Sequence, residues 1–130
     1  MMSGYVNANR EAIIQVAIVG ASKQLKSVRA IIDTGFTGDL TLPRDVIDKL
    51  GFTLRGFQRV ILGDGSVQYF EMFVGVVVWD GQMREAEINA AETGSLVGVG
   101  LLEDYKLEVE GRPNGEVRIT PLPASLSNTV

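Results

Sequence analysis

One aspartate in this sequence lies where an apolar segment enters a turn, a position suited to acid–base chemistry. Asp33 follows the apolar run Ala30-Ile31-Ile32 and precedes Thr34 and Gly35. Because those apolar residues bury the strand that delivers Asp33, we expect its carboxylate at the edge of a core. The glycine lets backbone pack where a Cβ would collide. Partial burial and neighbouring charge can then set the protonation of the carboxylate, as acid–base catalysis requires.

Two residue types that dominate enzyme active sites are missing, because the sequence contains no histidine and no cysteine. Without cysteine there is no disulfide, no thiol nucleophile and no thiolate metal ligand. Without histidine there is no Ser-His or Cys-His pair and no imidazole ligand for zinc. An enzyme built from this chain alone would therefore use Asp, Glu, Lys or Tyr as its acid–base groups. We expect neither a metal nor another cofactor.

Length and charge indicate one domain that does not bind nucleic acid. A chain of 130 residues with an apolar fraction of 45% can bury one core. We expect a single domain over 1–130, with the core within about 11–120 and a polar tail over 121–130. The net charge is −4 and no basic cluster occurs, whereas sequence-independent nucleic-acid binding needs a field of Lys and Arg.

The apolar segments are too short for a membrane or a signal peptide. Residues 1–10 are polar, and the longest apolar run, Met72 to Trp79, is far shorter than a bilayer span. We therefore expect a soluble protein located in the cytoplasm. Trp79 is better explained by packing than by a role in a site.

Short strands joined by glycine turns are predicted to position Asp33. Pro43 at the first helical position and Gly51 after the last one delimit a helix. The predicted strands cover 11–19, 24–32, 40–42, 57–62, 67–79, 82–90, 106–110 and 116–120, and the predicted helical segments cover 44–50 and 101–105. The chain is therefore expected to be all-β, that is, mainly β with one or two short helices, closed or sandwiched.

A glycine-rich tip, Gly63-Asp64-Gly65-Ser66, separates two of these strands. Glycine accepts the positive φ angles that tight hairpin turns need, so this segment predicts a hairpin with arms over 57–62 and 67–79. In the next strand, Met83, Ala86 and Ile88 do not alternate regularly, and the pattern does not assign its two faces.

The Asp33 turn has a weaker echo later in the chain. Residues 87–102 again contain a strand, an apolar segment with glycines and a helical segment. Three landmarks then stand in a characteristic order: Ile31-Ile32-Asp33-Thr34-Gly35, the hairpin over 63–66, and Leu96-Val97-Gly98 followed by Leu101-Leu102. With them the chain resembles the retropepsin-like (clan AA) aspartic proteases, and it is similar to the prokaryotic group whose active-site loop reads Asp-Thr-Gly-Phe. The resemblance covers about 11–120.

This resemblance implies a closed acid-protease barrel with one lobe per chain, and an aspartic endopeptidase that works as a homodimer. The chemistry independently requires a second carboxylate, because this chain carries a single Asp-Thr-Gly turn. A twofold axis would bring Asp33 of two chains together. Such a pair shares one proton, so that one member activates a water and the other hydrogen-bonds the scissile carbonyl of a peptide or protein substrate.

The same resemblance assigns roles to the residues around the turn. Asp33, Thr34 and Gly35 would form the catalytic loop, with the Thr34 hydroxyl bonding across the dimer axis and Gly35 admitting the substrate backbone. An extended peptide would bind by strand addition beneath the hairpin tip. The implied substrate contacts are Phe36, Thr37, Leu62, Gly63, Asp64, Gly65, Ser66 and Val97.

The sequence departs from the better-known members of that family next to the catalytic glycine. Phe36 stands where those enzymes usually carry Ala or Ser, and its ring either crowds the cleft or packs beneath it. Thr37 and Gly38 stand where viral relatives carry acidic residues that hold the peptide backbone. Asp39, one position further, either takes over that contact or is a solvated or capping residue before Leu40.

Two other classes of function remain open on the sequence. One is a peptide-binding or assembly module that keeps the protease fold without cutting, and the other is a purely structural β subunit. Terminal strands interleave in related dimers, so Tyr5 to Asn9 and Val117 to Thr120 are the candidates for a dimer interface here.

Overall fold

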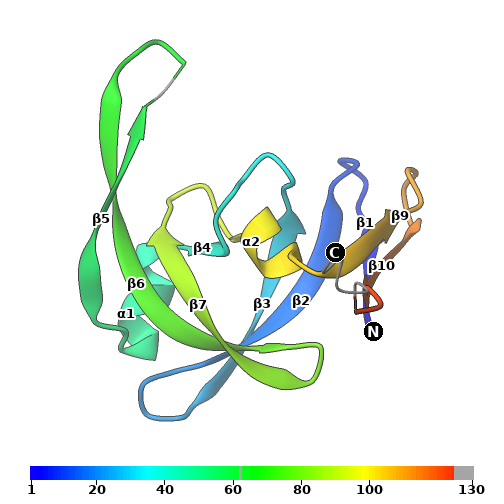
Figure 1. Ribbon diagram of the computed structural model, residues 1–130, viewed down its shortest axis with the longest axis horizontal. Coiled ribbons are helices and arrows are strands. Elements are labelled where there is room, and N and C mark those ends of the chain that lie inside the picture. The colour runs from blue at the N-terminus through cyan, green and yellow to red at the C-terminus, as the bar shows by residue number, and fades with distance from the viewer. Residues whose placement is uncertain (62, 125–130) are drawn as a thin grey trace, which may run out of the picture.

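The computed structural model describes residues 1–61 and 63–124, and within them the protein is mainly β (Figure 1). The strands are β1 (Met2–Val6), β2 (Ala12–Val19), β3 (Leu25–Ile32), β4 (Leu40–Leu42), β5 (Leu54–Ile61), β6 (Val67–Trp79), β7 (Gln82–Ala90), β8 (Leu96–Val97), β9 (Tyr105–Val109) and β10 (Glu116–Pro121), and the helices are α1 (Arg44–Leu50) and α2 (Val99–Leu102). None of the helices in these residues is long and apolar enough to cross a membrane.

The ten described strands follow one hydrogen-bonded order, β5-β6-β7-β4-β8-β3-β2-β1-β10-β9. A further antiparallel pairing joins β6 to β2, so the six strands from β6 to β2 in that order form a ring of pairings. Most neighbours are antiparallel, but β3 pairs with β8 and β4 pairs with β7 in parallel. The β3–β8 pairing brings Leu96 and Val97, far away in sequence, to the end of β3, where Asp33 follows.

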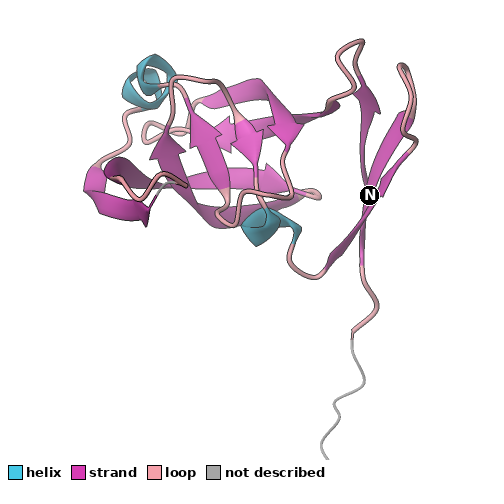
Figure 2. Ribbon diagram, turned by 90° about the horizontal axis from the view of Figure 1, so that it is seen from above, coloured by secondary structure: helices cyan, strands magenta, loops and turns pink. Residues whose placement is uncertain are grey.

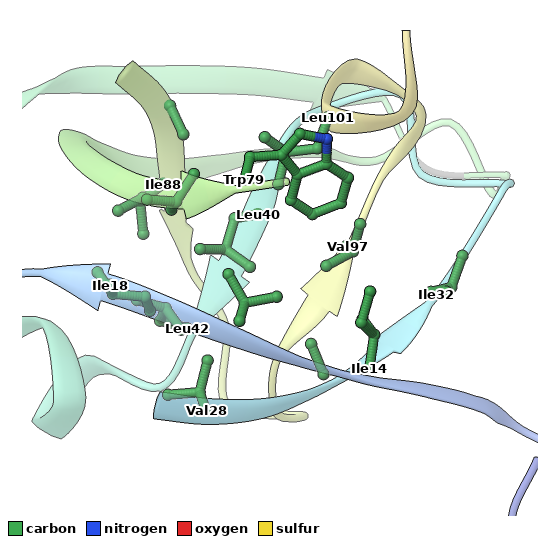
Figure 3. Close-up of a cluster of buried hydrophobic side chains, with 14 of the residues drawn as sticks. Ile14, Ile18, Val28, Ile32, Leu40, Leu42, Trp79, Ile88, Val97 and Leu101 are labelled. Carbon is green, nitrogen blue, oxygen red and sulfur yellow. The ribbon is translucent and has the colours of Figure 1, made fainter. Parts of the chain in front are cut away.

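The core lies between these strands, where alternate residues point inward (Figure 3). In β2, for example, Ile14, Val16 and Ile18 are at most 1% exposed. Burying each such side chain contributes about 1.5–3 kcal/mol to folding. Trp79 is 1% exposed and meets Tyr105 edge to face, so its predicted role in packing is confirmed.

Helix α1 covers the predicted residues, because its end signals are local. Pro43 precedes it, and Gly51 ends it at φ 75°, donating its N–H to the carbonyls of Ile47 and Asp48. This left-handed conformation favours glycine. Ile47 and Leu50 are its buried residues, and they attach the helix to the core.

The N-terminal strand was expected only as a candidate interface strand over Tyr5 to Asn9, whereas β1 covers Met2–Val6. β1 lies between β2 and β10, with Gly4 facing both Ile14 and Val117, and Val6 is buried. Figure 2 shows the group formed by β1, β9 and β10 at one end of the molecule. β1 and β10 are each paired on both sides within their own chain; the placement of Tyr5 to Asn9 and Val117 to Thr120 at a dimer interface stays a prediction. Among the described strands, β5 and β9 end the order.

Two other boundaries also differ from the sequence prediction. The second helix covers Val99–Leu102 rather than 101–105, because Asp104 takes a left-handed φ of 68° and Tyr105 already begins β9. β5 begins at Leu54, ahead of the predicted 57. Leu62, the predicted end of this strand, lies outside the described residues.

Candidate active site

Asp33 stands at the point where β3 leaves the core. Ile32 is buried and is paired with Val97 of β8. The backbone N–H of Asp33 donates to the carbonyl of Val97 at 2.9 Å, which fixes the main chain at the last step of the strand. The Asp33 side chain is half-buried. The sheet therefore delivers a partly exposed carboxylate from a rigid strand end.

The turn after Asp33 holds one oxygen of its carboxylate. The N–H of Gly35 donates to Asp33 Oδ1 at 2.9 Å, and the N–H of Phe36 donates to the Asp33 carbonyl at 3.1 Å. This is the local side-chain turn that Asp favours. An ideal Cβ on Gly35 would lie 3.2 Å from Oδ1, so a glycine leaves the carboxylate uncrowded. No donor within 1–61 and 63–124 bonds the other oxygen.

The loop between β3 and β4 is hydrogen-bonded to the start of α2. Main-chain N–H groups of Gly98, Val99 and Gly100 donate to the carbonyls of Asp39, Phe36 and Gly38 at 2.8–2.9 Å. A Cβ on Gly98 would lie 2.1 Å from the Gly38 carbonyl oxygen. Glycine is thus needed here for close backbone approach, and the Leu96-Val97-Gly98 landmark has a structural explanation.

Phe36 packs against the glycines around it. A Cβ on Gly38 would lie 2.5 Å from the Phe36 ring, and a Cβ on Gly98 would lie 2.6 Å from it. The ring therefore occupies space that these two glycines leave open, and it is half-buried. The Phe36 ring thus packs against the backbone at Gly38 and Gly98. Phe36 also lines a pocket.

Asp39 connects the loop to β7. Its carboxylate Oδ2 accepts a hydrogen bond from the backbone N–H of Glu87 at 2.9 Å, while its carbonyl accepts from Gly98. A Cβ on Gly100 would lie 2.2 Å from Asp39 Oδ1. Of the two sequence interpretations of Asp39, these contacts favour the capping role, since the carboxylate is engaged within its own chain.

A pocket of about 360 Å³ lies between the Asp33 loop and the β5–β6 hairpin. The two segments rise on the same side of the molecule in Figure 1, with the loop over 91–95 between them. The volume falls in the range of pockets that bind small ligands. The lining residues are Gly35, Phe36, Thr37, Thr41, Gln58, Phe70, Asn89, Ala90, Ala91, Thr93 and Leu96.

The pocket contains only part of the residue set that the sequence predicted for substrate contact. Phe36 and Thr37 line it beside Gly35. Val97 does not, because its side chain is fully buried in the core; its carbonyl instead holds the backbone of Asp33. The structure corrects its predicted role from contacting a peptide to positioning the loop.

The tip of the predicted hairpin stands apart from the pocket. β5 and β6 pair antiparallel up to Ile61 and Val67, so the hairpin itself is confirmed. Gly63, Asp64, Gly65 and Ser66 are exposed and do not line the pocket. Gln58 and Phe70, lower on the same hairpin, face each other in the pairing and do line it. Leu62 lies outside the described residues.

The hairpin tip is held by its own side chains. The Ser66 hydroxyl donates to Asp64 Oδ1 at 2.6 Å, and the Ser66 N–H donates to the same oxygen at 2.9 Å. These two bonds lower the pKa of the Asp64 carboxyl below its usual value, and the bond from the Ser66 hydroxyl has the larger effect. Gly65 adopts φ 85°, as the turn chemistry of this segment predicts.

Thr34 presents its side chain to solvent. It is exposed, and its hydroxyl makes no hydrogen bond to another residue in the described part of the chain. Within 1–61 and 63–124 the hydroxyl is therefore left free to bond a second chain.

Several pocket residues were missed at the level of sequence. Gln58 and Phe70 were detectable in principle, since paired hairpin arms place every second residue on one face. Asn89 gave a weaker signal, as a polar residue directly after the buried Ile88. Thr41 and Leu96 belong to the parallel and antiparallel pairings of β4 and β8, which short sequence patterns do not reveal.

Comparison with known proteins supports the architecture. No family model matches the sequence, and no curated protein does. Among solved structures, the chain is similar to the crystal structure of a retropepsin-like aspartic protease from Rickettsia conorii, with a TM-score of 0.59 over 95% of this chain and 92% of that one. The sequences are 19% identical over this match, so the likeness is one of fold. The fold is retropepsin-like.

In this retropepsin-like fold, the loop at the end of β3 and the hairpin β5–β6 lie beside each other. Both segments line one pocket, and the fold similarity extends over nearly the whole chain. Asp33 is the half-buried acid at the start of that loop.

Proposed function

We propose that this protein is an aspartic endopeptidase in which Asp33 from each of two chains forms the catalytic pair. The observation that carries the proposal is the setting of Asp33 itself: a half-buried carboxylate at a strand end, with one oxygen held by the Gly35 N–H and the other without a donor in the described residues. The retropepsin-like fold supports the proposal.

The homodimer follows from the chemistry. Two acid groups are needed to hydrolyse a peptide bond by this route, and the chain has one Asp-Thr-Gly turn. In a twofold dimer the same surface meets its own copy. The exposed Thr34 side chain beside Asp33 is suited to lie at that axis, and it would bond the second loop so that both carboxylates are fixed in one plane.

The two carboxylates in contact share one proton and titrate as a unit. The ionised member accepts a proton from a water as that water attacks the scissile carbonyl carbon, and the protonated member hydrogen-bonds the carbonyl oxygen. A gem-diol forms. It then collapses as a proton passes to the leaving nitrogen and the C–N bond breaks.

The substrate is an extended peptide held beside the Asp33 loop. Gly35 leaves room for its backbone, and Phe36 and Thr37 line the adjacent pocket. Gly63 to Ser66 belong to a hairpin tip that would close over the bound peptide and exclude water. This closure stays a prediction, as does the contribution of Leu62.

The test is the variant Asp33→Asn, which keeps the shape of the side chain but cannot act as the acid or base. We expect it to fold and dimerise like wild type and to lose cleavage of a peptide library by at least about a thousandfold. Asp45→Asn is the matched control, because it makes the same change on an exposed residue of α1 and should retain activity.

Cleavage by purified Asp33→Asn at the wild-type rate would contradict the proposal. Binding of library peptides by wild type, without turnover from acidic to neutral pH, would instead favour a peptide-binding module that keeps the protease fold.

A further inference from the structure

The pocket beside the Asp33 loop contains a buried donor without an acceptor. Asn89 is 5% exposed, and its side-chain Nδ2 has no hydrogen-bond partner within 1–61 and 63–124. Buried polar groups in folded proteins are nearly always paired, because an unpaired one forfeits its hydrogen bonds to water. Asn89 lines the pocket, so a bound molecule can supply the missing acceptor.

The strand geometry explains why Asn89 faces the pocket. Side chains alternate between the two faces of a strand, and Ile88, its neighbour in β7, is completely buried in the core (Figure 3). Asn89 therefore points to the opposite face, where Glu87 is exposed. On this face, residues of the hairpin and of the loop over 91–95 complete the pocket around Asn89.

The nearest polar side chain on the adjacent strand is already engaged. Thr41 faces Asn89 in the parallel pairing of β4 and β7. Its hydroxyl donates to the Gly94 carbonyl at 3.0 Å and accepts from the Leu96 N–H at 2.8 Å. The fold thus uses Thr41 to hold the loop and leaves the Asn89 amide for another partner.

The remaining walls define what that partner can be. Phe36, Phe70 and Leu96 contribute apolar surface, and Gln58 adds a second amide from the hairpin. None of the residues lining the pocket is ionisable. A charged group would lose its hydration there without gaining an opposite charge. A purely apolar group would leave the Asn89 donor buried and unpaired.

We propose that this pocket selects a substrate side chain with a neutral carbonyl acceptor, glutamine or asparagine, and that Asn89 Nδ2 donates to that carbonyl. The inference rests on the proposed peptidase function, because the side chain belongs to the peptide bound beside Asp33. The apolar walls pack against its methylene groups, and Gln58 can bond the amide end. Asn89 is thereby a specificity-determining residue rather than a catalytic one.

The first test is cleavage of a random peptide library by wild type, followed by matched peptides that differ at the selected position. Glutamine, methionine and glutamate are compared there, since methionine has a similar shape without the acceptor and glutamate adds a charge. We expect kcat/KM for glutamine to exceed that for either other peptide by about tenfold. Equal rates for glutamine and methionine at every position would overturn the proposal.

The variant Asn89→Leu assigns the preference to this residue. It should lose the preference for glutamine and cleave the methionine peptide at least as well, with thermal unfolding showing that it is folded. A folded Asn89→Leu that keeps the wild-type preference would overturn the proposal.

A binding measurement separates this inference from the proposed catalysis. The Asp33→Asn protein, which is not expected to cut, is titrated with the glutamine and methionine peptides while the side-chain amide signals of Asn89 are followed by NMR. We expect tighter binding of the glutamine peptide and a shift of the Asn89 amide protons with that peptide only. Binding without discrimination would overturn the inference even where cleavage by wild type upholds the peptidase function.

Discussion

At the scale of single residues, the carboxylates near the candidate site differ in the hydrogen bonds that they accept. Asp33 retains an oxygen without a donor in the described residues, whereas Asp39 accepts the Glu87 N–H and carries the loop. Asp64 is held by Ser66 at the exposed hairpin tip. The proposed catalysis therefore rests on Asp33, while the carboxylates of Asp39 and Asp64 accept hydrogen bonds from the backbone N–H groups of Glu87 and Ser66.

The titration of Asp64 provides a prediction at this scale. The bonds from Ser66 lower its pKa in the folded state, so the stabilising contribution is present above the unfolded pKa and is lost as the pH falls through the folded pKa. Ser66→Ala removes the hydroxyl bond, the larger cause. We expect the Asp64 pKa to rise toward its ordinary value in an NMR titration of the side-chain carboxyl.

Ser22→Ala, at an exposed serine in another turn, is the matched control and should leave Asp64 unchanged. An Asp64 titration that is the same in Ser66→Ala and wild type would show that the hydroxyl bond does not hold the hairpin tip in solution.

At the scale of elements, the loop after β3 depends on its contact with α2. The carbonyls of Phe36, Gly38 and Asp39 accept bonds from the N–H groups of 98–100. Arg84 in turn donates to the carbonyls of Gly100 and Leu101. The short helix α2 is thus bonded on one side to the loop after β3 and on the other to Arg84, and it supports that loop.

Gly98→Ala tests this contact. Its Cβ would lie 2.1 Å from the Gly38 carbonyl and 2.6 Å from the Phe36 ring, and backbone cannot yield cheaply. We expect the free energy of unfolding to fall by about 3 kcal/mol or more, measured by urea denaturation, with loss of peptide cleavage.

Gly111→Ala is the matched control, because a Cβ there meets nothing within 4 Å, and it should change stability by no more than about 0.5 kcal/mol. Equal stability of the two variants would mean that the loop does not pack on α2 as described.

Elements with local signals could be predicted from the sequence, and those that depend on distant pairing could not. Pro43 and Gly51 delimit α1, and the Gly65 turn marks the hairpin, because each signal lies within a few residues. The bounds of β1 were missed because its partners, β2 and β10, define it as a strand.

The residues of the candidate site also differ in whether a local sequence signal reveals them. Asp33 could be found from its apolar approach and its glycine turn. Val97 was misassigned because its place in a motif does not reveal which way its side chain points, and the structure buries it. In the described part of the chain, the Asn89 amide is buried and unpaired because Thr41, the hairpin and the loop over 91–95 come together around it. No short sequence pattern reveals this arrangement.

At the scale of the whole molecule, one chain supplies half of the proposed site. The ends of the strand order are β5 and β9, so the terminal strands β1 and β10 do not offer free edges. In the proposed dimer, the two Asp33 loops would meet each other. Thr34 is exposed at that place.

Thr34 gives a prediction about assembly. Thr34→Val keeps the shape of the side chain and removes the hydroxyl that would cross the dimer axis. We expect the dimer dissociation constant, measured by sedimentation, to rise about tenfold, while Thr34→Ser, which keeps the hydroxyl, stays near wild type. An unchanged dissociation constant in Thr34→Val would place Thr34 outside the interface.

The most direct test of the shared site mixes wild type with Asp33→Asn at a fixed total concentration and measures peptide cleavage after the subunits have exchanged. If each active site needs Asp33 from both chains, activity follows the square of the wild-type fraction and falls to about a quarter in an equal mixture. A linear fall, to about a half in that mixture, would show that each chain cleaves with its own carboxylate and would contradict the Asp33 pair.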